Sequence, residues 1–84
     1  MHETILVKEE SAGFAYSTHE KVIKLKIRPA RDGWFFEERC GTKGGTLKEE
    51  PTITVKSETA AIEMLDTKVS KAIADGYKIV VATR

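Results

Sequence analysis

Three side chains in this 84-residue chain suit acid–base or nucleophilic chemistry: His2, His19 and Cys40. A general base needs an oriented partner and a pocket, and neither histidine has an Asp-x-His or Cys-x-His companion. We expect His2 to lie in a frayed terminus and His19 in a turn beside Glu20, both solvated. The sequence therefore predicts no catalytic residue and no enzyme activity.

Cys40 is the single cysteine, so an internal disulfide is excluded. A nucleophilic cysteine must be a thiolate, and the neighbouring Glu37 and Glu38 favour the neutral thiol over the effect of Arg39. We expect Cys40 to be a half-buried strand residue, because free cysteine commonly packs as a small hydrophobe. Cys and His residues do not cluster as a zinc site requires, so we expect no metal or cofactor and a cytoplasmic location.

The run Gly-Thr-Lys-Gly-Gly at 41–45 is the glycine-rich segment of the chain. Backbone amides of a glycine loop can bind phosphate, but such loops end in Gly-Lys-Ser/Thr and open a helix. This run lies between two predicted strands, so the sequence favours a turn.

Lys24, Lys26 and Arg28 alternate with three apolar residues at 23, 25 and 27, which places the basic side chains on one face of a strand. Residues on neighbouring strands, Arg39 or Lys48, would widen this basic strip. Basic strips near aromatic rings are typical of nucleic-acid binding. The alternative is a solvated sheet face balanced by cross-strand carboxylates, and the candidates are Glu37, Glu38, Glu49 and Glu50.

The aromatic run Trp34-Phe35-Phe36 follows the basic strip. Trp34 and Phe36 share one side of an extended strand and Phe35 has the other, so at least one ring points away from the core. An exposed ring would stack on a base or anchor a protein partner. The candidate binding residues are Lys24, Lys26, Arg28, Trp34, Arg39 and Lys43.

These residues must be positioned by a β-hairpin over residues 21–40, with a turn at 29–33 in which Asp-Gly takes a positive φ. A further half-buried strand holds Ile53 and Val55, and Pro51 before it indicates an edge or a bulge. Toward the N-terminus we expect two short strands at 5–8 and 14–16, which extend the sheet at one edge.

Ser57 is a predicted N-cap and Gly76 a predicted helix stop. Between them an apolar stripe recurs at helical spacing, formed by Ala61, Ile62, Leu65, Val69, Ala72 and Ile73. The β-branched run 77–83 predicts a last strand packed well into the sheet. The fold class is therefore α+β: one antiparallel sheet covered on one face by one helix, followed by a final strand.

Composition agrees with a single domain spanning 1–84. The chain is 40% hydrophobic and 32% charged, too apolar for disorder and too polar for a membrane protein. A formal charge of +1 gives no overall attraction to nucleic acid or anionic lipid. The apolar run 5–7 is too short for a signal peptide or membrane span, so we expect no membrane association.

The order of elements over residues 21–77 resembles the WGR domain, a small module of poly(ADP-ribose) polymerases and of bacterial proteins. In that family a hairpin leads into a Trp-Gly-Arg segment, a Gly-Thr-x-Gly-x-Thr turn, a strand, and a helix ending in Gly-Tyr. Here the turn is 41–46 and the helix ends at Gly76-Tyr77. With the turns superposed, the signature positions hold Glu37, Glu38 and Arg39. In a second register Gly41 takes the motif glycine.

The resemblance implies a non-catalytic interaction module that recruits a protein or nucleic acid through its exposed sheet face. In the polymerases the signature contacts DNA ends, and the two carboxylates found here would repel phosphate. The alternatives are direct DNA or RNA binding through the basic strip, with Trp34 stacking, and a small homodimer that pairs through an open strand edge near Pro51. We expect a monomer or a weak homodimer.

Overall fold

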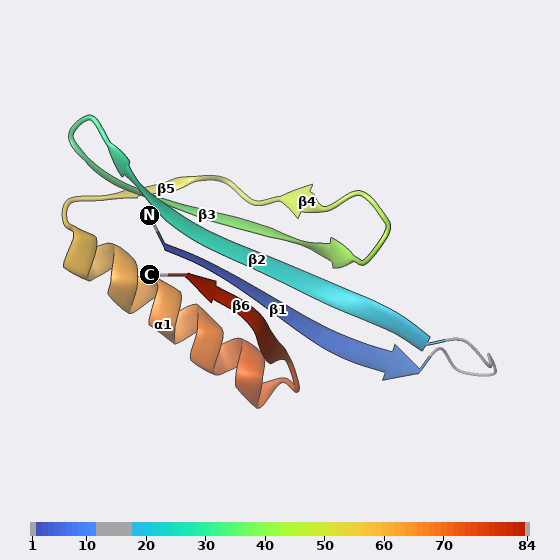
Figure 1. Ribbon diagram of the computed structural model, residues 1–84. Helices are drawn as coiled ribbons and strands as arrows, with labels where there is room; N and C mark the ends of the chain where they lie inside the picture. Colours follow the sequence, from blue (N-terminus) through green and yellow to red (C-terminus); the bar gives the residue numbers. More distant parts are fainter. Residues whose placement is uncertain (1, 12–17, 84) are drawn as a thin grey trace.

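A computed structural model describes residues 2–11 and 18–83 of the chain (Figure 1). Six strands and one helix follow one another in the order β1 (His2–Ser11), β2 (Thr18–Ala30), β3 (Gly33–Thr42), β4 (Lys48–Glu49), β5 (Ile53–Val55), α1 (Glu58–Ala74) and β6 (Lys78–Thr83). The strands form one antiparallel sheet in the order β4-β3-β2-β1-β6, and β5 also pairs with β3. Helix α1 lies across one face of this sheet, so the predicted fold class is confirmed.

The core lies between α1 and the sheet face that α1 covers. Strand alternation sends every second side chain of β1, β2 and β3 to this face. The buried cluster consists of Leu6, Leu25, Ile27, Phe36, Ala61, Leu65 and Ala72. Removing these apolar surfaces from water is the main driving force for the fold. We call this side of the sheet the helix face and the opposite side the open face.

The β2–β3 hairpin is longer than predicted, and its turn works differently. Ala30 pairs with Gly33, which leaves Arg31 and Asp32 as a two-residue turn. Among the described residues only Gly44 and Gly76 have positive φ, so the predicted positive φ at the Asp-Gly step is wrong. Glycine is needed at position 33 because β5 lies too close for a side chain: a Cβ there would overlap the carbonyl oxygen of Val55.

Helix α1 begins and ends as predicted. The backbone N–H of Ala60 donates to Ser57 Oγ at 3.1 Å, which satisfies one of the free donors at the helix start. Gly76 follows the helix with a φ of 102°, a conformation that costs glycine little. The prediction that Ile73 belongs to the apolar stripe facing the core is wrong, because this residue in the last turn is exposed.

The N-terminal segment differs from the prediction. Residues 5–8 belong to one ten-residue strand, β1, which pairs with β2 along its whole length and lies between β2 and β6 rather than at an edge. The predicted strand at 14–16 falls outside the described residues. His19 lies within β2, not in a turn. Residues 8–11 are all polar, so hydrophobic alternation could not predict that the strand continues through them. Their extended conformation comes from pairing with β2.

Strand β6 is the largest departure from the prediction. Among the described strands it pairs only with β1 and forms an edge of the sheet, and all six of its residues are exposed. The expectation of a strand packed well into the sheet is therefore wrong. A continuous β-branched run predicts burial on both faces, but α1 packs mainly against β2 and β3 and contacts β6 less, so the residues of β6 stay exposed.

Candidate binding site on the open face of the sheet

The basic strip of β2 lies on the open face, as its alternation predicts. Its apolar neighbours Leu25 and Ile27 are buried beneath α1, so Lys24, Lys26 and Arg28 point to the other side of the sheet. Strand β3 extends the strip, because Arg39 pairs with Lys24. Four of the six predicted binding residues therefore lie together on the open face.

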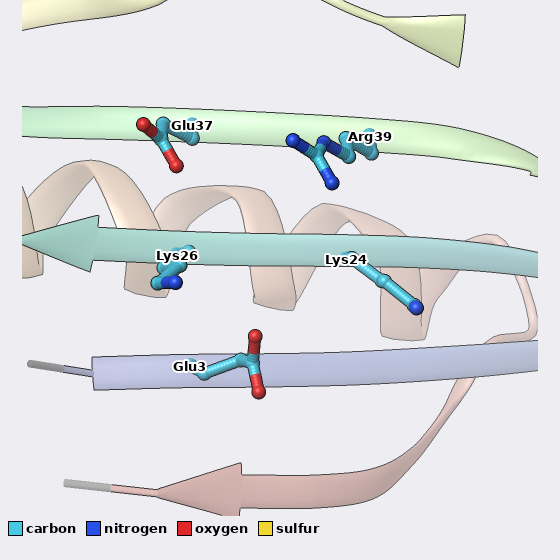
Figure 2. A pocket seen from close by; sticks show the side chains of 5 residues that line it. All are labelled: Glu3, Lys24, Lys26, Glu37 and Arg39. Atoms are coloured by element: carbon cyan, nitrogen blue, oxygen red, sulfur yellow. The ribbon is translucent and has the colours of Figure 1, made fainter. Parts of the chain in front are cut away.

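A shallow hollow of about 140 Å³ lies in the middle of this face. It is lined by Glu3 of β1, Lys24 and Lys26 of β2, and Glu37 and Arg39 of β3 (Figure 2). Three strands thus bring three basic and two acidic side chains to one place. Figure 2 shows α1 behind the sheet, on the side away from these side chains.

Arg28 is held by two neighbours at one end of the strip. Its Nε donates to Glu37 Oε1 at 2.7 Å, and the Glu37 side chain is only 18% exposed. The guanidinium also lies 4.6 Å from the centre of the Phe35 ring, which is within cation–π range. Arg28 is therefore held by an ion pair with Glu37 and by a contact with the Phe35 ring, while 43% of its side chain stays exposed.

Arg39 is held more loosely. Its Nη2 lies 3.5 Å from Glu49 Oε1, and more than half of each side chain is exposed. Exposed ion pairs of this length contribute little, typically less than about 1 kcal/mol. Arg39 can therefore exchange Glu49 for another acidic group at little cost.

Lys24 and Lys26 form no ion pair within the described residues, yet their surroundings differ. Lys26 lies between two carboxylates, since it pairs with Glu3 on β1 and with Glu37 on β3. Lys24 has the cation of Arg39 on one side and Ile5 on the other. In Figure 2 the Lys24 side chain extends toward β1 and away from Arg39. Lys24 is thus a basic group without a compensating charge directly opposite it.

The other two predicted residues lie elsewhere. Trp34 is on the helix face, opposite Pro29, where it packs against the core cluster. Phe35 takes the position on the open face instead. Lys43 lies in the turn after β3, and its Nζ is 3.1 Å from Glu20 Oε2. The structure therefore does not bring Trp34 or Lys43 into the hollow.

Two more side chains, proposed as neighbours of the strip, lie on the helix face. Lys48 pairs with Cys40, and Glu38 pairs with Leu25, so neither widens nor neutralises the open face. Glu38 Oε1 instead lies 3.4 Å from Lys68 Nζ of α1. Of the four expected balancing carboxylates, Glu37 and Glu49 act on this face, and sequence reasoning missed Glu3 because β1 was not placed beside β2.

His2 and Cys40 complete the set of chemically capable residues. His2 opens β1 with only 15% of its side chain exposed, and its Nε2 lies 3.7 Å from Glu58 Oε1, so the prediction of a solvated, frayed histidine is wrong. Cys40 is a half-buried strand residue, as predicted. No group of three His, Cys, Asp or Glu side chains in the described ranges could hold a metal ion.

No protein-family model, curated protein or solved structure matches this chain. In the part of the chain that the structure describes, no helix has the length and apolar content of a membrane span.

Proposed function

We propose that this protein is a non-catalytic interaction module whose open face binds an acidic segment of a protein partner. The observation that carries the proposal is the direct pairing of Lys24 with Arg39, two like charges at one side of a hollow. Lys26 adds a third cation on the same strand. An acidic side chain of the partner would supply the negative charge that Lys24 lacks in its two strand partners, and it would displace Glu49 from Arg39.

The energetic case rests on the like-charge pair. Like charges directly opposite one another on a sheet are destabilising, and an anion between them turns repulsion into attraction. A carboxylate about 4 Å from one cation gains ~1 kcal/mol in bulk water and ~4 kcal/mol at the reduced dielectric of a protein surface. Desolvation offsets part of this gain, so binding draws on several contacts along the strip.

The charge pattern favours a protein over a nucleic acid. Glu3 and Glu37 line the same hollow as the lysines, and regularly spaced phosphates would meet these carboxylates as well as the cations. A peptide can place its acidic groups selectively beside Lys24 and Arg39. Stacking by Trp34 has no support, because this ring packs against the core.

The order of elements supports a WGR-like assignment as part of the same proposal. A β2–β3 hairpin is followed by a glycine turn, the short strand β5, and a helix that ends at Gly76-Tyr77. In the register that superposes the turns, the signature positions Glu37 and Arg39 line the hollow and Glu38 faces α1. In this proposal the signature region keeps a binding role with altered charge.

Fluorescence anisotropy with a labelled hexaglutamate peptide tests the proposal. The wild-type protein should bind at low salt, and a Lys24→Gln/Arg39→Gln double variant should bind at least about tenfold more weakly because both flanking cations are lost. The matched control is Lys48→Gln/Lys56→Gln, which likewise removes two positive charges, here from exposed residues that do not line the hollow. Equal affinity for all three proteins would refute the proposal.

A second arm uses duplex and single-stranded DNA of mixed sequence at the same salt concentrations. If DNA binds more tightly than hexaglutamate, with affinity falling steeply as salt rises, phosphate contacts dominate and the nucleic-acid alternative replaces the proposal. We expect no saturable DNA binding.

A further inference from the structure

The outer edge of β6 combines free backbone groups with exposed apolar side chains. Ile79, Val80 and Val81 are 46%, 58% and 40% exposed, and Ile73 in the last turn of α1 is 49% exposed. These are four of the five large hydrophobic side chains that are exposed among the described residues; the fifth is Ile53. An apolar patch beside an unpaired strand edge is typical of an interaction surface.

The opposite edge of the sheet lacks these properties. It is formed by β4, which has two residues, and β5, which has three and follows Pro51. Short strands and proline are common protections against edge pairing. β6 carries neither: it is six residues long, contains no proline, and its only charged residue is Lys78 at one end. The one feature of this kind that it has is a bulge at Val80. The two edges of the sheet thus differ in their capacity to accept another strand.

The four residues of β6 that flank Val80 and Val81 have a facing pattern that is symmetric about the centre of the strand. Ile79 and Ala82 pair with Leu6 and Thr4, which are buried beneath α1, so both belong to the helix face. Lys78 and Thr83 pair with Val7 and Glu3 and belong to the open face. A register shift between Ile5 and Leu6 leaves Val80 as an extra residue without a partner on β1. Because of this bulge, residues three and five positions apart share a face.

From this symmetry we infer that β6 pairs with β6 of a second copy of the chain, antiparallel and centred between Val80 and Val81. Directly opposed residues of antiparallel strands lie on the same face. A centre between Val80 and Val81 meets this requirement, since Ile79 falls opposite Ala82 and Lys78 opposite Thr83. A regular six-residue strand could not meet it at this centre, because alternation would put each such pair on opposite faces.

Charge also suits a second copy. Lys78 of each chain falls opposite Thr83 of the other, so the pairing brings no like charges into direct contact. The two-fold relation is the closed symmetry common in homodimers, and it occupies both free edges at once. A foreign strand would not require a palindromic facing pattern. The symmetry therefore favours self-association over an unrelated partner.

Helix α1 contributes a second contact area. One flank of the helix, with Met64, Lys68 and Lys71, lines hollows toward β2, β3 and β5. The other flank, with Ile62, Val69 and Ile73, is therefore turned toward β1 and β6. In the two-fold pair both helices lie on the same side of a continuous sheet, so Ile73 and Ile79 of the two copies face a shared groove.

The contact is modest in size. Six paired residues form a contact about 20 Å long at ~3.3 Å per residue. One strand pair of this length buries less surface area than a standard protein–protein interface, and the helix flank adds to that area. We therefore expect a reversible dimer with a dissociation constant on the order of 10–100 μM.

Sedimentation equilibrium from roughly 10 μM to 1 mM, a range that brackets this value, tests the inference. The wild-type protein should shift from monomer to twice the monomer mass. Val80→Lys should raise the dissociation constant at least about tenfold, since it places two ammonium groups beside the two-fold axis. Val80 has no partner on β1, so the variant should keep its fold, which circular dichroism checks. Ile53→Lys, at the protected edge, is the matched control and should dimerise like wild type.

A mixture of Val80→Lys and Val80→Glu proteins gives the decisive result. Each variant alone should dimerise more weakly than wild type, and the mixture should form a heterodimer more tightly than either variant self-associates because opposite charges then meet at the axis. A wild-type protein that stays monomeric at about 1 mM, dimerisation unchanged by Val80→Lys, or a mixture that does not associate would each overturn the inference. Lys24→Gln should dimerise normally, so this outcome is independent of peptide binding on the open face.

Discussion

Lys24 lies directly opposite Arg39 across the β2–β3 pair, so two basic residues occupy paired strand positions on the open face. Two residues further along β2, Lys26 lies between Glu3 and Glu37. The same face therefore contains one basic residue that its surroundings stabilise and one that they do not. A pair of like charges costs folding free energy, and the proposed binding role would use that charge.

Neutralising these two lysines should have opposite effects on stability. Lys24→Gln removes a repulsion and should raise the free energy of unfolding by roughly 0.2–0.5 kcal/mol, whereas Lys26→Gln removes two attractions and should lower it by roughly 0.5–1 kcal/mol. Urea unfolding of both variants beside wild type measures the order of the midpoints. Both variants should bind hexaglutamate more weakly, so Lys24→Gln should separate stability from binding. A lower midpoint for Lys24→Gln than for Lys26→Gln would contradict this charge arrangement.

Gly33 should be intolerant of any side chain. A Cβ at this position would overlap the Val55 carbonyl oxygen, and a backbone atom paired in a sheet cannot move aside cheaply. Gly33→Ala should lower the free energy of unfolding by about 1–3 kcal/mol. Gly45→Ala is the matched control, because its Cβ meets only an ordinary contact with Thr42 O at 3.4 Å. Equal stability of the two variants would show that β5 does not lie against Gly33.

Loss of the N-cap of α1 should lower the free energy of unfolding. Ser57→Ala removes the acceptor for the Ala60 N–H and should lower the free energy of unfolding by about 1 kcal/mol. Ser57→Asp should retain most of that stability, since aspartate is an equally good cap and its charge suits the helix N-terminus. Thermal unfolding followed by circular dichroism compares the three proteins, and an unchanged midpoint for Ser57→Ala would place the helix start elsewhere.

Trp34 should report on folding but not on binding. It is the only tryptophan, and it lies on the helix face against the core. Its emission should therefore shift to longer wavelength when the protein unfolds. Addition of hexaglutamate or DNA should leave the emission of the folded protein unchanged. Strong quenching by DNA, as expected for a ring stacked on a base, would contradict the placement of Trp34.

Local patterns predicted much of this fold from the sequence. Alternation in residues 23–28 identified β2 and its two faces, and cap residues at Ser57 and Gly76 identified α1. Each of these signals depends on a few adjacent residues and on rules that hold in any protein. The Phe35 position on the open face follows from the same alternation.

The remaining features depend on contacts between distant segments. β1 was not recognised as an interior strand because its order comes from pairing with β2 and β6. For the same reason the sequence did not predict that Glu3 lines the hollow or that His2 lies near Glu58 of α1. Ile79, Val80 and Val81 have the composition of buried residues, yet the chain folded alone leaves them at the edge. The inferred two-fold pairing would reconcile their composition with their position.

Amide chemical-shift mapping during titration with hexaglutamate tests the central claim most directly. An isotope-labelled sample of the 84-residue protein gives one backbone amide signal for each non-proline residue beyond the first. We predict the largest saturable shifts at Lys24, Lys26 and Arg39, with little change along the α1 flank at Met64 and Lys68. Shifts confined to that flank or to β6, or no saturable shift at all, would contradict the assignment of the open face as the binding surface.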